Sequence, residues 1–136
     1  MKTYFDHKKL DVYQESIAFC GWVGELLGQV SAKAAAKDQL DRASTSLPLN
    51  IAEGNGKFSR VDRARFLEIA RGSALECAAC LDVLAVRKLI AIEEIVPAKE
   101  KLVRIVNMMG MLKRFSVRAE FLREDDGLYA IEHEQE

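Results

Sequence analysis

The sequence holds few of the residues that cross-link a chain or break its regular structure. In 136 residues it has two prolines, eight glycines and three cysteines, and aromatic residues make up only 7%. So little proline and glycine argues against a disordered or low-complexity chain. Because the chain is long enough to fold without cross-links, the odd number of cysteines argues against a disulfide framework and favours reduced thiols.

Long hydrophobic runs are also missing. Charged residues or glycines interrupt every apolar stretch well before the roughly 18 residues that a membrane-spanning helix needs. Residues 1–9 are polar and include three lysines, which does not fit a secretion signal. We therefore expect a cytoplasmic protein that has no membrane partner.

What is present is typical of one globular domain. Hydrophobic residues make up 49% of the chain and charged residues 30%, and the length fits a single domain. The net charge of −1 is unevenly distributed, because residues 120–136 contain seven acidic residues and one base, Arg123. We expect a four-helix bundle over residues 1–119 and an acidic tail over residues 120–136.

Apolar residues recur every three or four positions in four segments, which is the pattern of amphipathic helices. These segments span residues 10–30, 38–53, 59–86 and 92–115. None shows the alternation of a β-strand. The sequence therefore predicts an all-α fold, an up-down four-helix bundle.

Local signals predict how the second helix bends and ends. Pro48 removes the hydrogen bond to the carbonyl of Ser44, so we expect a kink, with the hydroxyl of Ser44 or Thr45 helping to satisfy the freed groups. Gly54 is expected to end this helix in the left-handed conformation. Ser59 is expected to cap the third helix.

Three glycines mark one side of the first helix. Gly21, Gly24 and Gly28 are spaced three and four residues apart, so they share a face. Their missing side chains predict that another helix approaches closely there.

The third helix is apolar on nearly all sides. Between residues 74 and 86 only Glu76 and Asp82 are charged, whereas a four-helix monomer leaves one face of every helix in water. We expect a second copy of the chain to cover this face. The predicted interface residues are Leu75, Ala79, Val83 and Val86.

The middle of the chain resembles a known family. The stretch RASTSLPLNIAEGNGKFSRVDRARFLEIARGSALE, residues 42–76, is similar to the four-helix-bundle proteins called 23S ribosomal RNA intervening-sequence proteins. It joins a segment of the form S-[IL]-P-x-N-I-A-E-G to one of the form R-F-L-x-I-A-R-G-S-x-x-E, and the likeness covers residues 8–115. The resemblance implies a ring-shaped homo-oligomer, a pentamer, but no reaction.

Some relatives of that family are accessory subunits of the reverse transcriptases of diversity-generating retroelements. Their strongly basic surface binds RNA and the polymerase. This chain departs from them, because its pI is near 6.2 and its tail is acidic.

Polar residues of the two family segments form one candidate cluster. They are Ser46, Asn50, Glu53, Gly54, Arg71 and Ser73. A recognition or catalytic pocket is one interpretation. We favour the other, a hydrogen-bonded network that joins the second helix to the third, because these side chains include no nucleophile with a positioned base.

Basic residues gather around the turn before the third helix and along it. They are Lys57, Arg60, Arg63, Arg65 and Arg71. Repeated around a ring, they would form a positive rim able to meet RNA phosphates in a salt-sensitive way. We favour an ordinary solvated face with ion pairs, since no aromatic residues alternate with the bases.

Cys77 and Cys80 form a CxxC pair, which suggests redox chemistry or zinc. Both fall in mid-helix among apolar residues, so we expect buried, unreactive thiols, and the two histidines offer no zinc-binding spacing. We expect no metal, no cofactor and no small-molecule substrate. Met108, Met109 and Met111 are interpreted as core residues rather than a partner groove.

These observations predict a protein that is not an enzyme. We expect a homo-oligomeric helical scaffold or adaptor that presents surfaces to a protein or RNA partner. The alternative is an RNA-binding accessory factor, for example to a reverse transcriptase.

Overall fold

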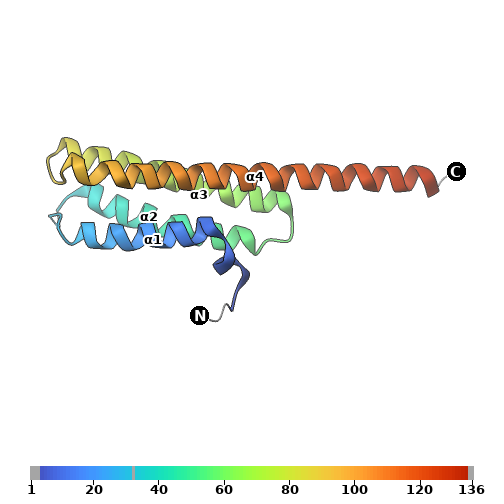
Figure 1. Ribbon diagram of the computed structural model, residues 1–136, viewed down its shortest axis with the longest axis horizontal. Helices are drawn as coiled ribbons and strands as arrows, with labels where there is room; N and C mark the ends of the chain where they lie inside the picture. Colours follow the sequence, from blue (N-terminus) through green and yellow to red (C-terminus); the bar gives the residue numbers. More distant parts are fainter. Residues whose placement is uncertain (1–3, 32, 135–136) are drawn as a thin grey trace.

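The chain folds into four long helices. The structure is a computed structural model that describes residues 4–31 and 33–134, and from residue 115 onward it describes the backbone only. The elements are η1 (Asp6–Lys9), α1 (Asp11–Leu27), α2 (Ala35–Asn55), α3 (Arg60–Val86) and α4 (Ile92–Glu134). Consecutive helices run in opposite directions (Figure 1). The described residues contain no strand, so the predicted all-α fold class is confirmed.

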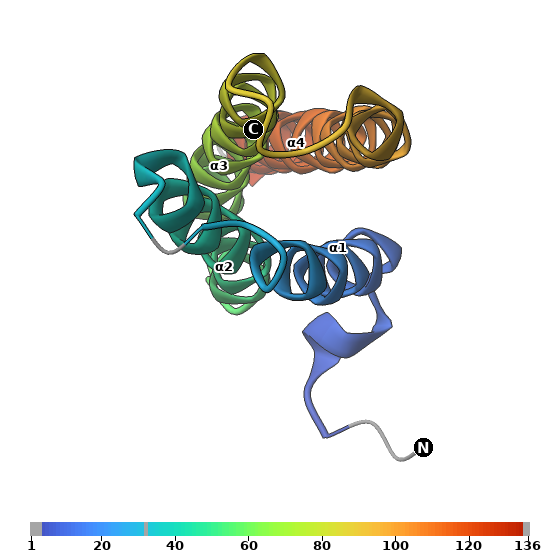
Figure 2. The ribbon, with the colours of Figure 1, turned by 90° about the vertical axis from the view of Figure 1, so that its left-hand side faces the viewer.

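The helices stand at the corners of a four-sided bundle (Figure 2). Helix α3 packs against α2 and α4, and α2 also packs against α1, whereas α1 and α4 meet over a smaller area. Large apolar side chains from all four helices, such as Phe19, Leu47, Leu81 and Ile105, are fully buried. No described helix combines the length and the apolar character needed to cross a membrane.

Helix α2 continues through Pro48, and its freed carbonyl has a partner that the sequence did not predict. The Cys20 thiol on α1 donates to the carbonyl oxygen of Ser44, at a sulfur–oxygen distance of 2.8 Å. The hydroxyls of Ser44 and Thr45 both donate to the carbonyl oxygen of Asp41 instead. The predicted role of these hydroxyls was therefore wrong, because a thiol on the neighbouring helix is close enough to take the bond.

Gly54 does not end α2 in the left-handed conformation, so this prediction was also wrong. The helix extends to Asn55, and none of the described glycines has a positive φ. Gly54 is needed for a different reason, because a Cβ at this position would lie 2.7 Å from the Cβ of Phe66 on α3. The predicted cap of α3 is confirmed, since the Ser59 hydroxyl accepts a hydrogen bond from the backbone N–H of Asp62 at 3.3 Å.

The glycine face of α1 is open. A Cβ built on Gly21 or Gly24 would meet nothing within 4 Å. The predicted close approach of another helix is therefore not made within the chain. The core of the bundle lies on the opposite side of α1, where Phe19 and Val23 are buried.

Helix α4 is longer than predicted. It runs to Glu134 instead of ending near Phe115, and its last part projects beyond the other three helices (Figure 1). The sequence after residue 115 contains no proline, the residue that most strongly breaks a helix. The predicted division into a bundle (1–119) and an acidic tail (120–136) stays a prediction, since no break in the helix marks it.

Candidate functional site

Three residues of the predicted polar cluster form one hydrogen-bonded chain between α2 and α3. The Asn50 amide donates to the hydroxyl and the carbonyl oxygens of Ser46, at 2.9 and 2.8 Å. The Ser73 hydroxyl on α3 lies 2.9 Å from the Ser46 hydroxyl. Ser73 is buried and the other two are half-buried. The bond between Ser73 and Ser46 joins the two helices, whereas the two Asn50 bonds stay within α2.

Glu53 and Arg71 do not join that chain. Both side chains are exposed, and within the described part of the molecule neither makes a hydrogen bond or an ion pair. Arg71 acts on Glu68 only through its charge, and the larger influence is Lys113, whose ammonium lies 2.6 Å from the Glu68 carboxylate and lowers its pKa. The ionic members of the predicted cluster therefore stay outside the hydrogen-bonded chain, although Glu53 lines the same surface hollow of α2 as Ser46 and Asn50.

The turn between α2 and α3 forms a basic corner, which we define as Lys57, Arg60 and Arg63. Two of these cations have contacts within the chain. Arg63 Nε donates to the carbonyl oxygen of Lys57 at 2.7 Å, and the Lys57 ammonium lies 4.9 Å from the centre of the Phe66 ring. The half-buried Arg60 makes no hydrogen bond or ion pair with the described residues. Its guanidinium is therefore available to an external anion.

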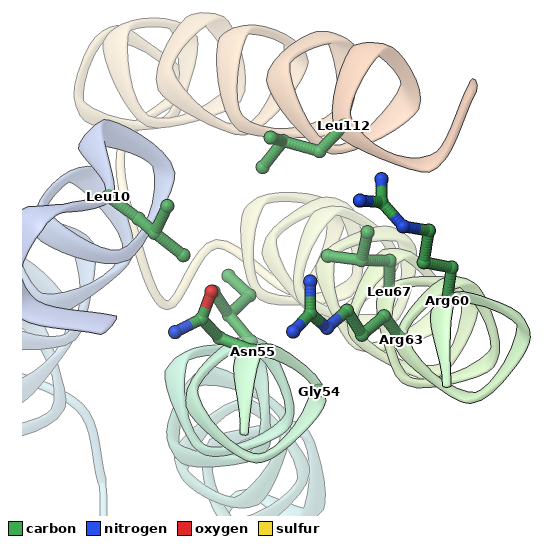
Figure 3. Close-up of a pocket in the computed structure, with 8 residues that line it drawn as sticks. Leu10, Gly54, Asn55, Arg60, Arg63, Leu67 and Leu112 are labelled. Carbon is green, nitrogen blue, oxygen red and sulfur yellow. The ribbon is translucent and has the colours of Figure 1, made fainter. Parts of the chain in front are cut away.

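A pocket of about 170 Å³ opens beside this corner. Figure 3 shows Arg63 reaching toward Asn55, while Arg60 points toward α4. The pocket combines guanidinium and amide groups with apolar walls from all four helices or their ends. Its lining residues are Leu10, Ile51, Gly54, Asn55, Arg60, Arg63, Leu67 and Leu112.

The other two predicted bases lie away from the pocket. Arg65 is exposed and forms an ion pair with Asp62 at 3.3 Å, and Arg71 is exposed farther along α3. The five predicted cations therefore do not form one patch. Three of them, Lys57, Arg60 and Arg63, make up the basic corner, and the other two lie outside it.

A second hollow lies next to the basic corner, between the start of α1 and α4. It is lined by residues 9–12 together with Met108, Met111 and Leu112. Met109 is buried, as predicted for a core residue, but Met111 is 64% exposed. The prediction that all three methionines fill the core was therefore wrong for Met111, because α1 and α4 do not close over it.

The three cysteines are free thiols. Burial raises the pKa of Cys77 to about 12, with a smaller contribution from the neighbouring Cys80. Burial also raises the pKa of the Cys20 and Cys80 thiols. A raised pKa keeps a thiol protonated and weakly nucleophilic. Among the described residues no group of three potential ligands is placed to hold a metal ion.

The outer face of α3 carries exposed apolar side chains. Leu75, Val83 and Val86 are 49%, 40% and 81% exposed, and Ala79 between them is exposed as well. The four positions are spaced four, four and three residues apart, so they lie on one stripe of the helix. We call this stripe the α3 face.

Sequence reasoning missed the apolar walls of the pocket. Leu10, Leu67 and Leu112 were assigned to helical core stripes or to a helix start, and nothing in their spacing distinguishes a pocket wall from a core position. The basic corner itself was foreseen from the density of arginines after Gly54. Only the fold shows which of those arginines are paired.

Comparison with known proteins agrees with the sequence motifs. The family described as 23S rRNA-intervening sequence protein matches residues 8–111. A solved structure has the same fold with a TM-score of 0.71, and it is a protein with unknown function from the S23 ribosomal protein family of Bacteroides thetaiotaomicron. The two chains are 23% identical over 75% of this chain and 97% of that one. No curated protein matches.

Proposed function

The chain belongs to the family of 23S rRNA-intervening sequence proteins, and from this premise we propose that it is a non-enzymatic, homo-oligomeric scaffold or adaptor. Its oligomer presents surfaces to another protein or to RNA. The three free thiols fit a cytoplasmic location.

The α3 face is the observation that carries this proposal. Large apolar side chains that share one stripe and remain exposed mark a protein–protein interface more often than scattered apolar residues do. The stripe lies in the middle and second half of α3, where α2 and α4 cover the other sides of the helix. A second copy that covers Leu75, Val83 and Val86 would remove this apolar surface from water.

The polar cluster supports a role without catalysis. The hydroxyls of Ser46 and Ser73 bond to each other, and the Asn50 amide bonds back to Ser46. No positioned base accompanies them in that network. An arrangement of this kind stabilises the contact between two helices.

Sedimentation equilibrium tests the scaffold proposal. The wild-type chain is expected to form an oligomer, with five times the chain mass of 15.2 kDa if the ring is a pentamer. Replacing Leu75 and Ala79 with glutamate should break the ring and lower the mass, because burying two carboxylates in an apolar interface is costly. The matched control is Val103→Glu, since Val103 is 60% exposed but lies on α4.

Two results would reject this interface. One is a wild-type chain that stays monomeric and folded at about 100 µM, a concentration at which an interface of ordinary strength is fully formed. The other is a Leu75→Glu, Ala79→Glu variant of unchanged mass. Circular dichroism should show the same helix content in both variants and in the wild type.

We also propose a second candidate, an RNA-binding accessory factor, because the guanidinium of Arg60 has no partner among the side chains that the structure describes. Binding of a single-stranded RNA is then expected at low salt, with an affinity that falls steeply as salt rises. Arg60→Glu should weaken this binding, whereas Lys101→Glu on the exposed side of α4 should not. If RNA does not bind at about 50 mM salt, this candidate fails.

A further inference from the structure

We propose that the acidic end of α4, residues 120–134, docks on the basic corner of a second copy of this chain. The contact does not use the α3 face. The two contacts are therefore tested by different substitutions, the glutamates on the α3 face for one and the charge swap for the other.

The first argument is the charge that remains at the basic corner after the internal ion pairs are formed. Asp62 is paired with Arg65 at 3.3 Å, and Glu68 is paired with Lys113 at 2.6 Å. These acids therefore do not neutralise Lys57, Arg60 and Arg63. The corner keeps a local positive charge, and within residues 4–31 and 33–114 the Arg60 guanidinium has no partner.

The second argument is the position of the acidic segment. Helix α4 leaves the bundle at the same end as the turn between α2 and α3 (Figure 1). It continues as one helix to Glu134, which places residue 134 about 30 Å beyond residue 114 at 1.5 Å per residue. The acidic segment thus points away from the basic corner of its own chain, and only the corner of another copy can receive it.

The third argument is the order of charges along the projecting part of α4. The basic residues Lys113, Arg114 and Arg118 come first, and five of the six acidic residues in 120–134 follow Arg123. When two projecting helices lie antiparallel, the acidic end of each meets the basic start of the other. A parallel arrangement would place like charges together. A two-fold contact between identical chains has this antiparallel symmetry.

The fourth argument is apolar surface. The segment 115–131 includes two phenylalanines, two leucines, a tyrosine and an isoleucine, and most of the stability of a helix in a protein comes from the packing of such side chains. The pocket beside the basic corner offers Leu10, Leu67 and Leu112 as apolar walls. An acidic amphipathic helix therefore matches both the charge and the chemistry of this site.

A charge swap in the full-length chain tests the contact. One variant carries Lys57→Glu and Arg60→Glu, and the other carries Glu124→Lys and Asp125→Lys. Both are made in the Leu75→Glu background, so that the α3 face does not contribute. Each alone should associate at least about tenfold more weakly than the background chain, which corresponds to 1.4 kcal/mol. An equimolar mixture should regain association as a mixed dimer in native mass spectrometry, and the Lys101→Glu control should leave association unchanged.

Cross-linking of the wild-type chain gives an independent readout. Equal amounts of ¹⁴N- and ¹⁵N-labelled protein are treated with a zero-length carbodiimide reagent, which joins a lysine amine to a carboxylate in direct contact. We expect Lys57 of one label joined to the acidic segment 120–134 of the other label. If Lys57 links only within its own chain and the mixed variants do not associate, the proposal is overturned. It is equally overturned if RNA binding requires Arg60 while no link between chains forms.

Discussion

The interface between α2 and α3 and the interface between α1 and α4 are built in opposite ways. Between α2 and α3 a glycine lets the helices approach, and the Ser73 hydroxyl of α3 bonds to the Ser46 hydroxyl of α2. Between α1 and α4 the contact is smaller, and a hollow lined by Leu10, Met108 and Met111 remains open. The molecule therefore has one closely packed side and one loosely packed side.

The two family segments lie on the closely packed side. Ser46–Gly54 belongs to α2 and Arg65–Glu76 belongs to α3. Ser46 and Ser73 bond to each other across this contact, and Ser46, Asn50 and Glu53 also line an open hollow on the surface of α2. The comparison teaches that the most recognisable part of this sequence specifies a helix–helix contact, while the basic corner and most of the α3 face lie outside the two segments.

The largest expected effect comes from Gly54→Ala. The new Cβ would lie 2.7 Å from the Cβ of Phe66, and a Cβ cannot move away without its backbone. Overpacking of this kind costs about 1–3 kcal/mol. Denaturant unfolding should show this loss in the free energy of unfolding.

Gly24→Ala is the matched control. A Cβ at Gly24 meets nothing within 4 Å, so the variant should gain up to about 1 kcal/mol from the better helix propensity of alanine. The two substitutions are chemically identical and should have opposite signs. Equal effects would mean that Phe66 of α3 does not approach Gly54 closely.

The next largest effect is expected at Cys20, whose thiol takes the place of the backbone N–H that Pro48 lacks. Cys20→Ala removes the hydrogen bond to the Ser44 carbonyl, which Pro48 cannot supply, and should cost about 1 kcal/mol beyond the loss of side-chain packing. In a Pro48→Ala chain the backbone N–H of residue 48 takes over that bond, so Cys20→Ala should then cost less. A double-mutant cycle measures the difference. Additive effects would show that the thiol does not serve this carbonyl.

The sequence predicted the helices well because each has a clear periodic stripe. The ends were harder to predict. Glycine is common at helix ends, so Gly54 was expected to end α2. The helix continues to Asn55 instead, and the missing side chain of Gly54 leaves room for Phe66. Local propensity and tertiary packing favour the same residue type for different reasons, and only the packed structure distinguishes them.

The same limit applies to the candidate site. The density of arginines after Gly54 predicted a basic region, but not that Arg65 is paired with Asp62 while Arg60 has no partner among the described side chains. Likewise, the thiol of Cys20 and the carbonyl of Ser44 are 24 residues apart in the chain, and no periodicity relates them. Contacts between helices of this kind depend on helix rotation and spacing, which a single sequence does not specify.

The smallest expected effect tests the loosely packed side. Arg104 on α4 and Glu15 on α1 form an ion pair across it at 3.4 Å, and the Arg104 side chain is 69% exposed. Exposed pairs contribute at most about 1 kcal/mol and less at high salt. Arg104→Gln should therefore lower the free energy of unfolding by about 0.5 kcal/mol or less, and the loss should shrink in 1 M salt. A loss of stability as large as that of Gly54→Ala would mean that this ion pair is the main contact that holds α1 to α4. The two interfaces would then differ in the kind of contact and not in its strength.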